Sequence, residues 1–187
     1  MSMEGFIKMP LKLISTNGGS YNLKFRNVNN SGKFRSSITA MQSYIYYRWQ
    51  ITQAKTTPPQ ANCVQASEFV FRLNGVDQSM SGVTVTNPSG NNPVGEGPGN
   101  LVDGSVALKA LDLNFVSNGL TNFIFQFSSA KAFNGYRWAT ANDEESRDPK
   151  SWTIAGSNNG TSWTTLHTVT NFTATTTRNT YQTAQTY

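Results

Sequence analysis

Short runs of β-branched and aromatic residues, each bounded by turn residues, most constrain what this chain can fold into. No segment shows a sustained helical period of apolar residues over an adequate length. Strands of this length and spacing predict an all-β chain, built as an antiparallel β-sandwich or jelly roll. The predicted strands are YYRWQITQ (46–53), SEFVFRL (67–73), GVTVTN (82–87), NFIFQFS (122–128), GYRWATA (135–141), SWTIAGS (151–157), WTTLHTVTNF (163–172) and NTYQTAQTY (179–187).

The first 44 residues differ from the rest of the chain in charge and pattern. Residues 1–55 carry eight Lys or Arg against Glu4 alone, although the whole chain has a net charge of only +5. LKLIS (11–15) and YNLKFRNV (21–28) alternate with a period near two around a turn-like NGGS. Two strands alone are marginally stable, so we expect residues 1–44 to form a basic β-arm that docks on the body, residues 45–187, or on a neighbouring subunit. The residues expected to dock are Lys24, Phe25, Arg26, Phe34 and Arg35.

The basic arm leaves more than one partner open. A basic segment can favour nucleic acid or an acidic protein surface. Its bases are spaced out rather than clustered, which weakens the case for nucleic acid as the partner. A solubilising, loosely ordered tail remains an equal alternative.

Composition also predicts the compartment. The single Cys63 cannot form an internal disulfide, so folding does not depend on an oxidising environment. The N-terminus lacks the uninterrupted apolar stretch of a signal peptide, and no segment approaches the roughly 20 apolar residues of a membrane helix. We therefore expect a soluble protein without membrane insertion, made in the cytoplasm of its cell or host.

Two motifs carry a resemblance to a known family. The first is NLVDG at residues 100–104, and the second is RDPKSWTIAGSNNGTSW at residues 147–163. Together they resemble the discoidin-like, coagulation-factor type C family of galactose-binding-like domains. The resemblance covers about residues 46–187 and implies a discoidin-like jelly roll in which Trp138 and Trp152 face the core.

A third pair of segments resembles this family in a different order. YYRWQITQ and CVQASEFVF (63–71) are similar to paired strands that end the module in many relatives, but here they precede NLVDG. This order implies a permuted arrangement, in which the early pair fills that place in the sheet. The alternative is a last edge left open to another chain.

The charged segment Asp143 to Lys150 has a structural and a functional interpretation. The resemblance implies a corner between two core strands, with Arg147 paired to Asp143 or Asp148. The alternative is that this segment contacts a ligand or partner. The candidate contact residues are then Asp143 and Arg147, together with three residues of the Gly- and Pro-rich loop 87–100. Those three residues are Asn91, Asn92 and Glu96.

Catalysis is the least favoured function. Carboxylates on one solvated loop lack the burial that would tune one of them as an acid. His167, the only histidine, has no Cys or His at ligand spacing, and no nucleophile motif accompanies it. We expect a protein that is not an enzyme.

The resemblance implies one structural Ca²⁺, with Asp103 and Glu68 at the two acidic ligand positions. Oxygen ligands suit this hard cation. Ser105, Leu108 and Ala110 stand where relatives have Asn, Thr and Trp, which removes side-chain ligands and a supporting ring. Both a bound ion and an empty position stay open.

Two functions remain. Chains with the early strand pair resemble structural and attachment proteins of large DNA viruses and phages, which implies a virion or capsid-associated module that contacts other subunits of an assembly. The alternative is a carbohydrate-binding module for a cell-surface glycan. Loops 78–82 and 87–100 contain no aromatic residue, and all four tryptophans fall at strand or core positions, which disfavours strong sugar binding.

Overall fold

The computed structural model describes residues 21–22, 39–56 and 62–187. The chain divides into two units, residues 1–41 and residues 42–187. In the first unit, β1 (Tyr21–Asn22) pairs with β2 (Thr39–Ala40) in antiparallel orientation. The predicted strand 11–15 and the five predicted docking residues, Lys24, Phe25, Arg26, Phe34 and Arg35, lie outside the described residues.

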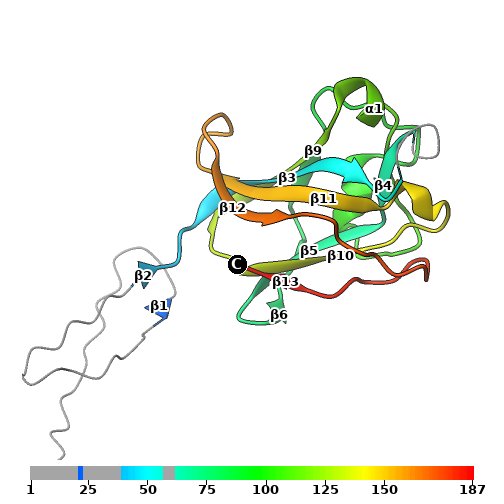
Figure 1. Ribbon diagram of the computed structural model, residues 1–187. Coiled ribbons are helices and arrows are strands. Elements are labelled where there is room, and N and C mark those ends of the chain that lie inside the picture. Colours follow the sequence, from blue (N-terminus) through cyan, green and yellow to red (C-terminus); the bar gives the residue numbers. More distant parts are fainter. Residues whose placement is uncertain (1–20, 23–38, 57–61) are drawn as a thin grey trace, which may run out of the picture. The chain divides into compact units, whose positions relative to one another are not determined.

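Two antiparallel sheets form the framework of residues 42–187, as Figure 1 shows. The five-stranded sheet has the order β12-β11-β3-β9-β7, and the four-stranded sheet has the order β13-β10-β5-β6. The first contains β3 (Tyr44–Ala54), β7 (Thr84–Thr86), β9 (Thr121–Lys131), β11 (Pro149–Ser157) and β12 (Thr164–Val169). The second contains β5 (Glu68–Leu73), β6 (Val76–Asp77), β10 (Gly135–Ala139) and β13 (Gln185–Thr186). The predicted all-β class with antiparallel pairing is confirmed.

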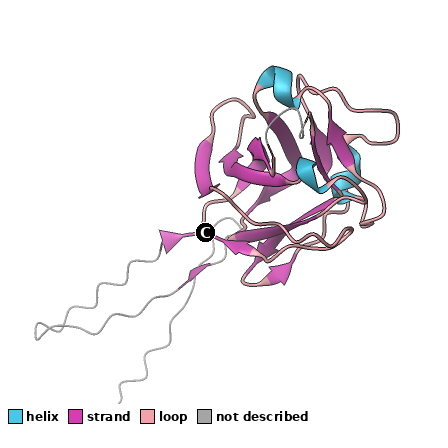
Figure 2. Cartoon of the chain, turned by 45° about the vertical axis from the view of Figure 1, so that its right-hand side comes forward, coloured by secondary structure: helices cyan, strands magenta, loops and turns pink. Residues whose placement is uncertain are grey.

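The remaining elements are short. A separate pair joins β4 (Val64–Ala66) to β8 (Ala110–Asp112). The helical segments are η1 (Pro98–Val102), α1 (Phe115–Asn118) and η2 (Glu145–Arg147), seen in Figure 2 between far longer stretches of strand and loop. None of the helices in the described part of the chain is long and apolar enough to cross a membrane.

One predicted strand is largely irregular. Of residues 179–187, only Gln185–Thr186 forms a strand, β13. The preceding residues still follow β10, because Gln182 N–H donates to Trp138 O (2.8 Å) and Thr140 N–H donates to Thr180 O (3.0 Å). Side-chain hydrogen bonds of Thr140 to this segment replace a regular ladder of backbone hydrogen bonds. The predicted strand over residues 179–187 was therefore wrong outside Gln185–Thr186.

The two early segments do not pair with each other, which corrects the expectation drawn from the resemblance. β3 lies between β11 and β9, whereas β5 lies between β10 and β6. They meet through side chains instead, since the Trp49 and Phe69 rings are 4.9 Å apart. Both segments are rich in aromatics, and each supplies one face of a shared core.

An aromatic core lies between the two sheets. Alternation along β3 points Tyr47, Trp49 and Ile51 inward, and all three are fully buried. Trp138 of β10 and Trp152 of β11 are buried as predicted, with their rings 6.0 Å apart in an edge-to-face arrangement. Because alternate residues of each strand fill this core, the residues between them are displayed on the outer faces of the sheets, where the candidate sites lie.

Candidate functional site

Glu68 and Asp103, the two residues predicted for a metal, lie on one cavity of about 500 Å³. Phe69 and Phe71 of β5 point into the core, so alternation places Glu68 on the opposite face of the sheet. Glu68 is nevertheless only 1% exposed. The other residues that line the cavity are Val70, Ser79, Met80, Ser81, Gly82, Val102, Gly104 and Tyr181.

The cavity holds a carboxyl group in an unfavourable setting for its charge. Burial raises the pKa of Glu68 to about 7, and the nearby carboxylate of Asp103 acts in the same direction. Glu68 Oε1 accepts a hydrogen bond from Gly104 N–H (2.6 Å), and Oε2 accepts one from Phe69 N–H (3.2 Å). Gly104 has a φ of +81°, a left-handed conformation that glycine adopts without strain. The Asp-Gly turn therefore presents its amide to Glu68.

These residues fit a hard cation in charge. No Lys or Arg lines the cavity, and neither carboxylate forms an ion pair with the described residues. Two neighbouring carboxylates with hydroxyl groups of Ser79 and Ser81 on the same cavity offer only oxygen, which Ca²⁺ prefers. Leu108 is 51% exposed and supplies no ligand, and no group of three His, Cys, Asp or Glu converges in residues 39–56 and 62–187.

Tyr181 brings an aromatic ring to this cavity, which the sequence did not predict. Residues 179–187 were expected to be a strand, and the loops expected at a binding site contain no aromatic residue. The Arg137 guanidinium lies 3.9 Å from the centroid of the Tyr181 ring and also pairs with Asp77. Asp77 pairs in addition with Arg72 (2.8 Å). The wall of the cavity is thus held by a charged network on β5, β6 and β10.

The charged segment 143–150 is organised around a buried ion pair. Asp148 is completely buried, and Arg178 binds it through Nη1 (2.9 Å) and Nη2 (2.6 Å). These hydrogen bonds raise the pKa of Arg178. The prediction that Arg147 pairs with Asp143 or Asp148 was wrong, because among the described residues Asp143 pairs with Lys109 and Asp148 with Arg178. Asp148 is buried, whereas the neighbouring Arg147 is partly exposed. The segment is a corner clamped by the C-terminal part of the chain.

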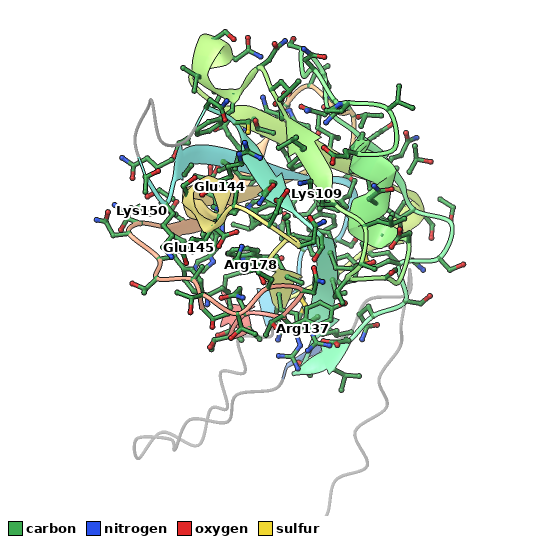
Figure 3. The ribbon with its side chains drawn as sticks, turned by 90° about the vertical axis from the view of Figure 1, so that its right-hand side faces the viewer. Lys109, Arg137, Glu144, Glu145, Lys150 and Arg178 are labelled. Carbon is green, nitrogen blue, oxygen red and sulfur yellow. The ribbon has the colours of Figure 1, made fainter. Side chains whose placement is uncertain are left out.

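Lys109 joins the two loops that were predicted to contact a partner. Its Nζ lies 2.6 Å from Asp143 Oδ2 and 3.7 Å from Glu96 Oε1, and its side chain is 7% exposed. Burial acts to raise the pKa of Asp143, but hydrogen bonds from Lys109 and Gln65 lower it overall. Figure 3 shows where Lys109, Glu144 and Arg178 lie on the ribbon.

The predicted asparagines of the loop 87–100 have structural partners. Asn91 N–H donates to Asp112 Oδ1 (2.9 Å), and Asn92 Nδ2 donates to Leu111 O (2.6 Å). Both contacts fasten the loop to β8. The structure therefore brings Glu96 and Asp143 together through Lys109, with Arg147 near enough to influence the pKa of Asp143, whereas Asn91 and Asn92 serve as loop anchors.

A third feature lies on the outer face of the five-stranded sheet. Trp163, expected at a strand or core position, is partly exposed and lies just before β12. The Arg48 guanidinium is 4.7 Å from the centroid of the Trp163 ring. The neighbouring outward residue of β3 is Tyr46, whose ring lies beside Gly160 of the same turn. We refer to Tyr46, Arg48 and Trp163 as the basic-aromatic patch.

His167 has a structural environment. Tyr136 OH accepts a hydrogen bond from Trp152 Nε1 (2.7 Å) and lies 2.9 Å from His167 Nδ1. The hydroxyl therefore donates its own proton to Nδ1 of a neutral imidazole. Burial lowers the pKa of His167, which favours this neutral form.

Comparison with known proteins adds no relative. No protein family, no curated protein and no solved structure matches this chain.

Proposed function

We propose that this chain is a non-catalytic assembly module, a virion or capsid-associated structural protein that contacts neighbouring subunits. Residues 42–187 would be a discoidin-like β-sandwich and residues 1–41 a basic arm. The proposal rests on the two motifs and on two antiparallel sheets that share an aromatic core. Such a protein is expected in the virion or in the cytoplasm of the producing cell.

The division of the chain at residue 41 is the observation that carries the assembly role. Residues 1–41 contain six bases and one acid, whereas residues 42–187 contain nine of each. A separate segment of one sign can recognise an acidic surface on another subunit at long range. A balanced body without such a surplus suits a unit that packs beside its neighbours.

Two of the three buried carboxylates among the described residues have structural partners, whereas the third, Glu68, faces the cavity. Asp148 is clamped by Arg178, and Asp112 accepts hydrogen bonds from the backbone N–H groups of Asn91 and Asn114 and from Thr121 Oγ1 (2.6 Å). Groups held in this way stabilise loops and corners. They are not free to exchange protons with a substrate.

Light scattering of the full chain after size exclusion tests the assembly role. We expect a mass that is a multiple of the chain mass, and a shift to the monomer when Lys24 and Arg26 are both replaced by glutamine. A matched control replaces two bases of the body, Lys131 and Lys150, by glutamine and should leave the oligomer intact. A monomeric full chain whose residues 1–41 resist limited proteolysis would contradict the proposal.

Carbohydrate binding is the second candidate, and the Glu68–Asp103 cavity favours it. The cavity combines an aromatic ring, Tyr181, with hydroxyl groups of Ser79 and Ser81, which are groups that commonly contact sugars. A bound Ca²⁺ would hold the two carboxylates together and so order the walls of the cavity. A glycan array probed in calcium and again in chelator tests this candidate, with Asp103→Asn as the matched variant. We expect glycan binding in calcium that is lost in chelator and in the variant. If no glycan binds in calcium or in chelator, this candidate is rejected and the assembly role remains.

A further inference from the structure

The five-stranded sheet has an unbalanced charge. Its strands contain Arg48, Lys131 and Lys150, but no Asp or Glu. The four-stranded sheet, in contrast, contains Glu68 and Asp77 beside its two arginines. A ligand that approaches the outer face of the five-stranded sheet therefore meets positive charge without a competing carboxylate on its strands.

Arg48 lies at an outward position of β3, and it has no acceptor among the described residues. In the described part of the chain it forms the stacking contact with Trp163, but neither an ion pair nor a side-chain hydrogen bond. Its Nε is buried without a partner, whereas Nη1 and Nη2 are not among the buried unpaired atoms. The two terminal nitrogens are thus not fully buried, while burial of the group lowers the pKa of Arg48.

The two aromatic residues of the patch add open polar groups. Neither Tyr46 OH nor Trp163 Nε1 is buried without a partner, and neither has a hydrogen bond to the residues that the structure describes. Both are therefore accessible to a ligand. Gln50 is the next outward residue of β3 after Arg48, and its amide donates to Asn122 Oδ1 of β9 (3.0 Å), which leaves an amide oxygen and an amide N–H for further contacts.

The position of the patch limits how a partner can bind. Arg48 lies on β3, which is paired on both sides by β11 and β9, at Ala155 and Ile124 respectively. The backbone groups of β3 are therefore used, so an extended peptide cannot add a strand here as it can at an edge. Recognition must come from side chains alone, through one guanidinium, two rings and the neighbouring amides.

We propose that the basic-aromatic patch binds a carboxylate-bearing saccharide. Arg48 holds the carboxylate end-on through Nη1 and Nη2, and Tyr46 and Trp163 contact the sugar with their rings and polar groups. The guanidinium fork matches a carboxylate in geometry and charge, and stacking on Trp163 fixes its plane. Rings that carry a polar group suit a ligand with both C–H faces and hydroxyls. None of the three residues of the patch lines the Glu68–Asp103 cavity.

Calorimetric titration of the full chain with matched sugars tests the proposal. The acidic probes are 3′-sialyllactose and a hyaluronan tetrasaccharide, and their neutral counterparts are lactose and the carboxyl-reduced tetrasaccharide. We expect at least one acidic probe to bind about tenfold or more tightly than its neutral counterpart, since a hydrogen bond to a charged group contributes on this scale. Equal affinity within both pairs, or no binding by either acidic probe, would overturn the proposal.

Variants locate the binding on the patch. Arg48→Met keeps the stem of the side chain and should lower the affinity for the acidic probe about tenfold or more. Arg48→Lys keeps the charge but loses the guanidinium fork, so its affinity should lie between those of the unaltered chain and Arg48→Met. Trp163→Ala should also weaken binding, and Lys150→Met, which removes another base of the same sheet, should not. Unchanged affinity in Arg48→Met, or tighter binding of a poly-glutamate peptide than of either sugar, would overturn the proposal.

Two readouts keep the result separate from folding and from assembly. Urea unfolding of Arg48→Met and Arg48→Lys verifies that each variant is folded at the temperature of the titration. Light scattering should give these variants the same oligomer mass as the unaltered chain, because the assembly role depends on residues 1–41. Loss of sugar binding with an unchanged mass supports the patch, and loss of both together would show that the patch belongs to the assembly interface instead.

Discussion

Replacing Glu68 by glutamine should remove a strong dependence of stability on pH. The carboxyl group is 1% exposed, and burial raises its pKa from an ordinary 4.5 to about 7. One pKa unit corresponds to about 1.4 kcal/mol of free energy between the two protonation states. The shift therefore corresponds to roughly 3 kcal/mol of folding stability that depends on pH.

The direction in which stability changes with pH follows from which state, folded or unfolded, binds the Glu68 proton more tightly. The folded chain holds the Glu68 proton at pH values where the unfolded chain has lost it. Stability from the protonated group is therefore fully present below about pH 4.5 and is lost as the pH rises through about 7. Relative to Glu68→Gln, the unaltered chain should lose about 3 kcal/mol between pH 4.5 and pH 8.5.

The contribution of His167 to folding stability changes with pH in the opposite direction and has to be separated from that of Glu68. Burial lowers its pKa below the ordinary 6.5, so its contribution is present above that value and is lost as the pH falls. Both proteins contain His167, so its contribution cancels in the difference between their free energies of unfolding. The difference, rather than either curve alone, reports Glu68.

Urea unfolding followed by tryptophan fluorescence provides the measurement, in chelator and at several pH values between 4.5 and 8.5. Asp103→Asn removes a charge that helps to raise the pKa of Glu68, so its pH-dependent loss should be smaller than that of the unaltered chain. Glu144→Gln alters an exposed carboxylate and should leave the dependence unchanged. A difference between the unaltered chain and Glu68→Gln that stays constant with pH would refute the raised pKa.

Three further outcomes are expected. Arg178→Met leaves the buried Asp148 without its cation and should lower the free energy of unfolding by about 3–5 kcal/mol, measured by urea titration; a loss below 1 kcal/mol would contradict a buried pair. Trp152→Phe should lower the free energy of unfolding by about 1 kcal/mol more than Trp49→Phe in the same titration. Of these two indole N–H groups, that of Trp152 has a hydrogen-bond partner in the described structure and that of Trp49 has none. Equal losses in the two variants would contradict this prediction. Millimolar CaCl₂ at pH 8 should raise the melting temperature of the unaltered chain but not of Glu68→Gln, and a rise of equal size in both would place the ion elsewhere.

Much of the fold was predictable, because it depends on local pattern. Alternating aromatic and polar residues indicated β3, β5, β9 and β11 close to their observed positions. The inward direction of Trp138 and Trp152 was expected from the resemblance, and both are buried. Strand pairing was less predictable, since β3 and β5 carry equally good patterns for either sheet. Their separation is decided by which aromatic rings meet across the core, and this depends on the whole chain.

The candidate sites depended on contacts between distant segments. Glu68 and Asp103 were expected together only because the resemblance linked them, and they do share a cavity. Arg178 was not expected to bind Asp148, because no local pattern identifies which of several bases reaches a buried acid 30 residues away. Lys109 was missed for the same reason, although two predicted acids converge on it.

The two outer faces can act separately, because the core keeps their charges apart. Stacked sheets lie about 10 Å apart, and the outward side chains add to that distance. Arg48 on one face and Glu68 on the other are therefore separated by both sheets and the core, and their Coulomb interaction falls with that distance. Changing Arg48 should therefore leave the pH dependence of Glu68 unaltered, and calcium at Glu68 should leave the affinity of the patch for an acidic sugar unaltered. Acidic and basic recognition can coexist on residues 42–187, since each sheet presents its own charge on its own outer face.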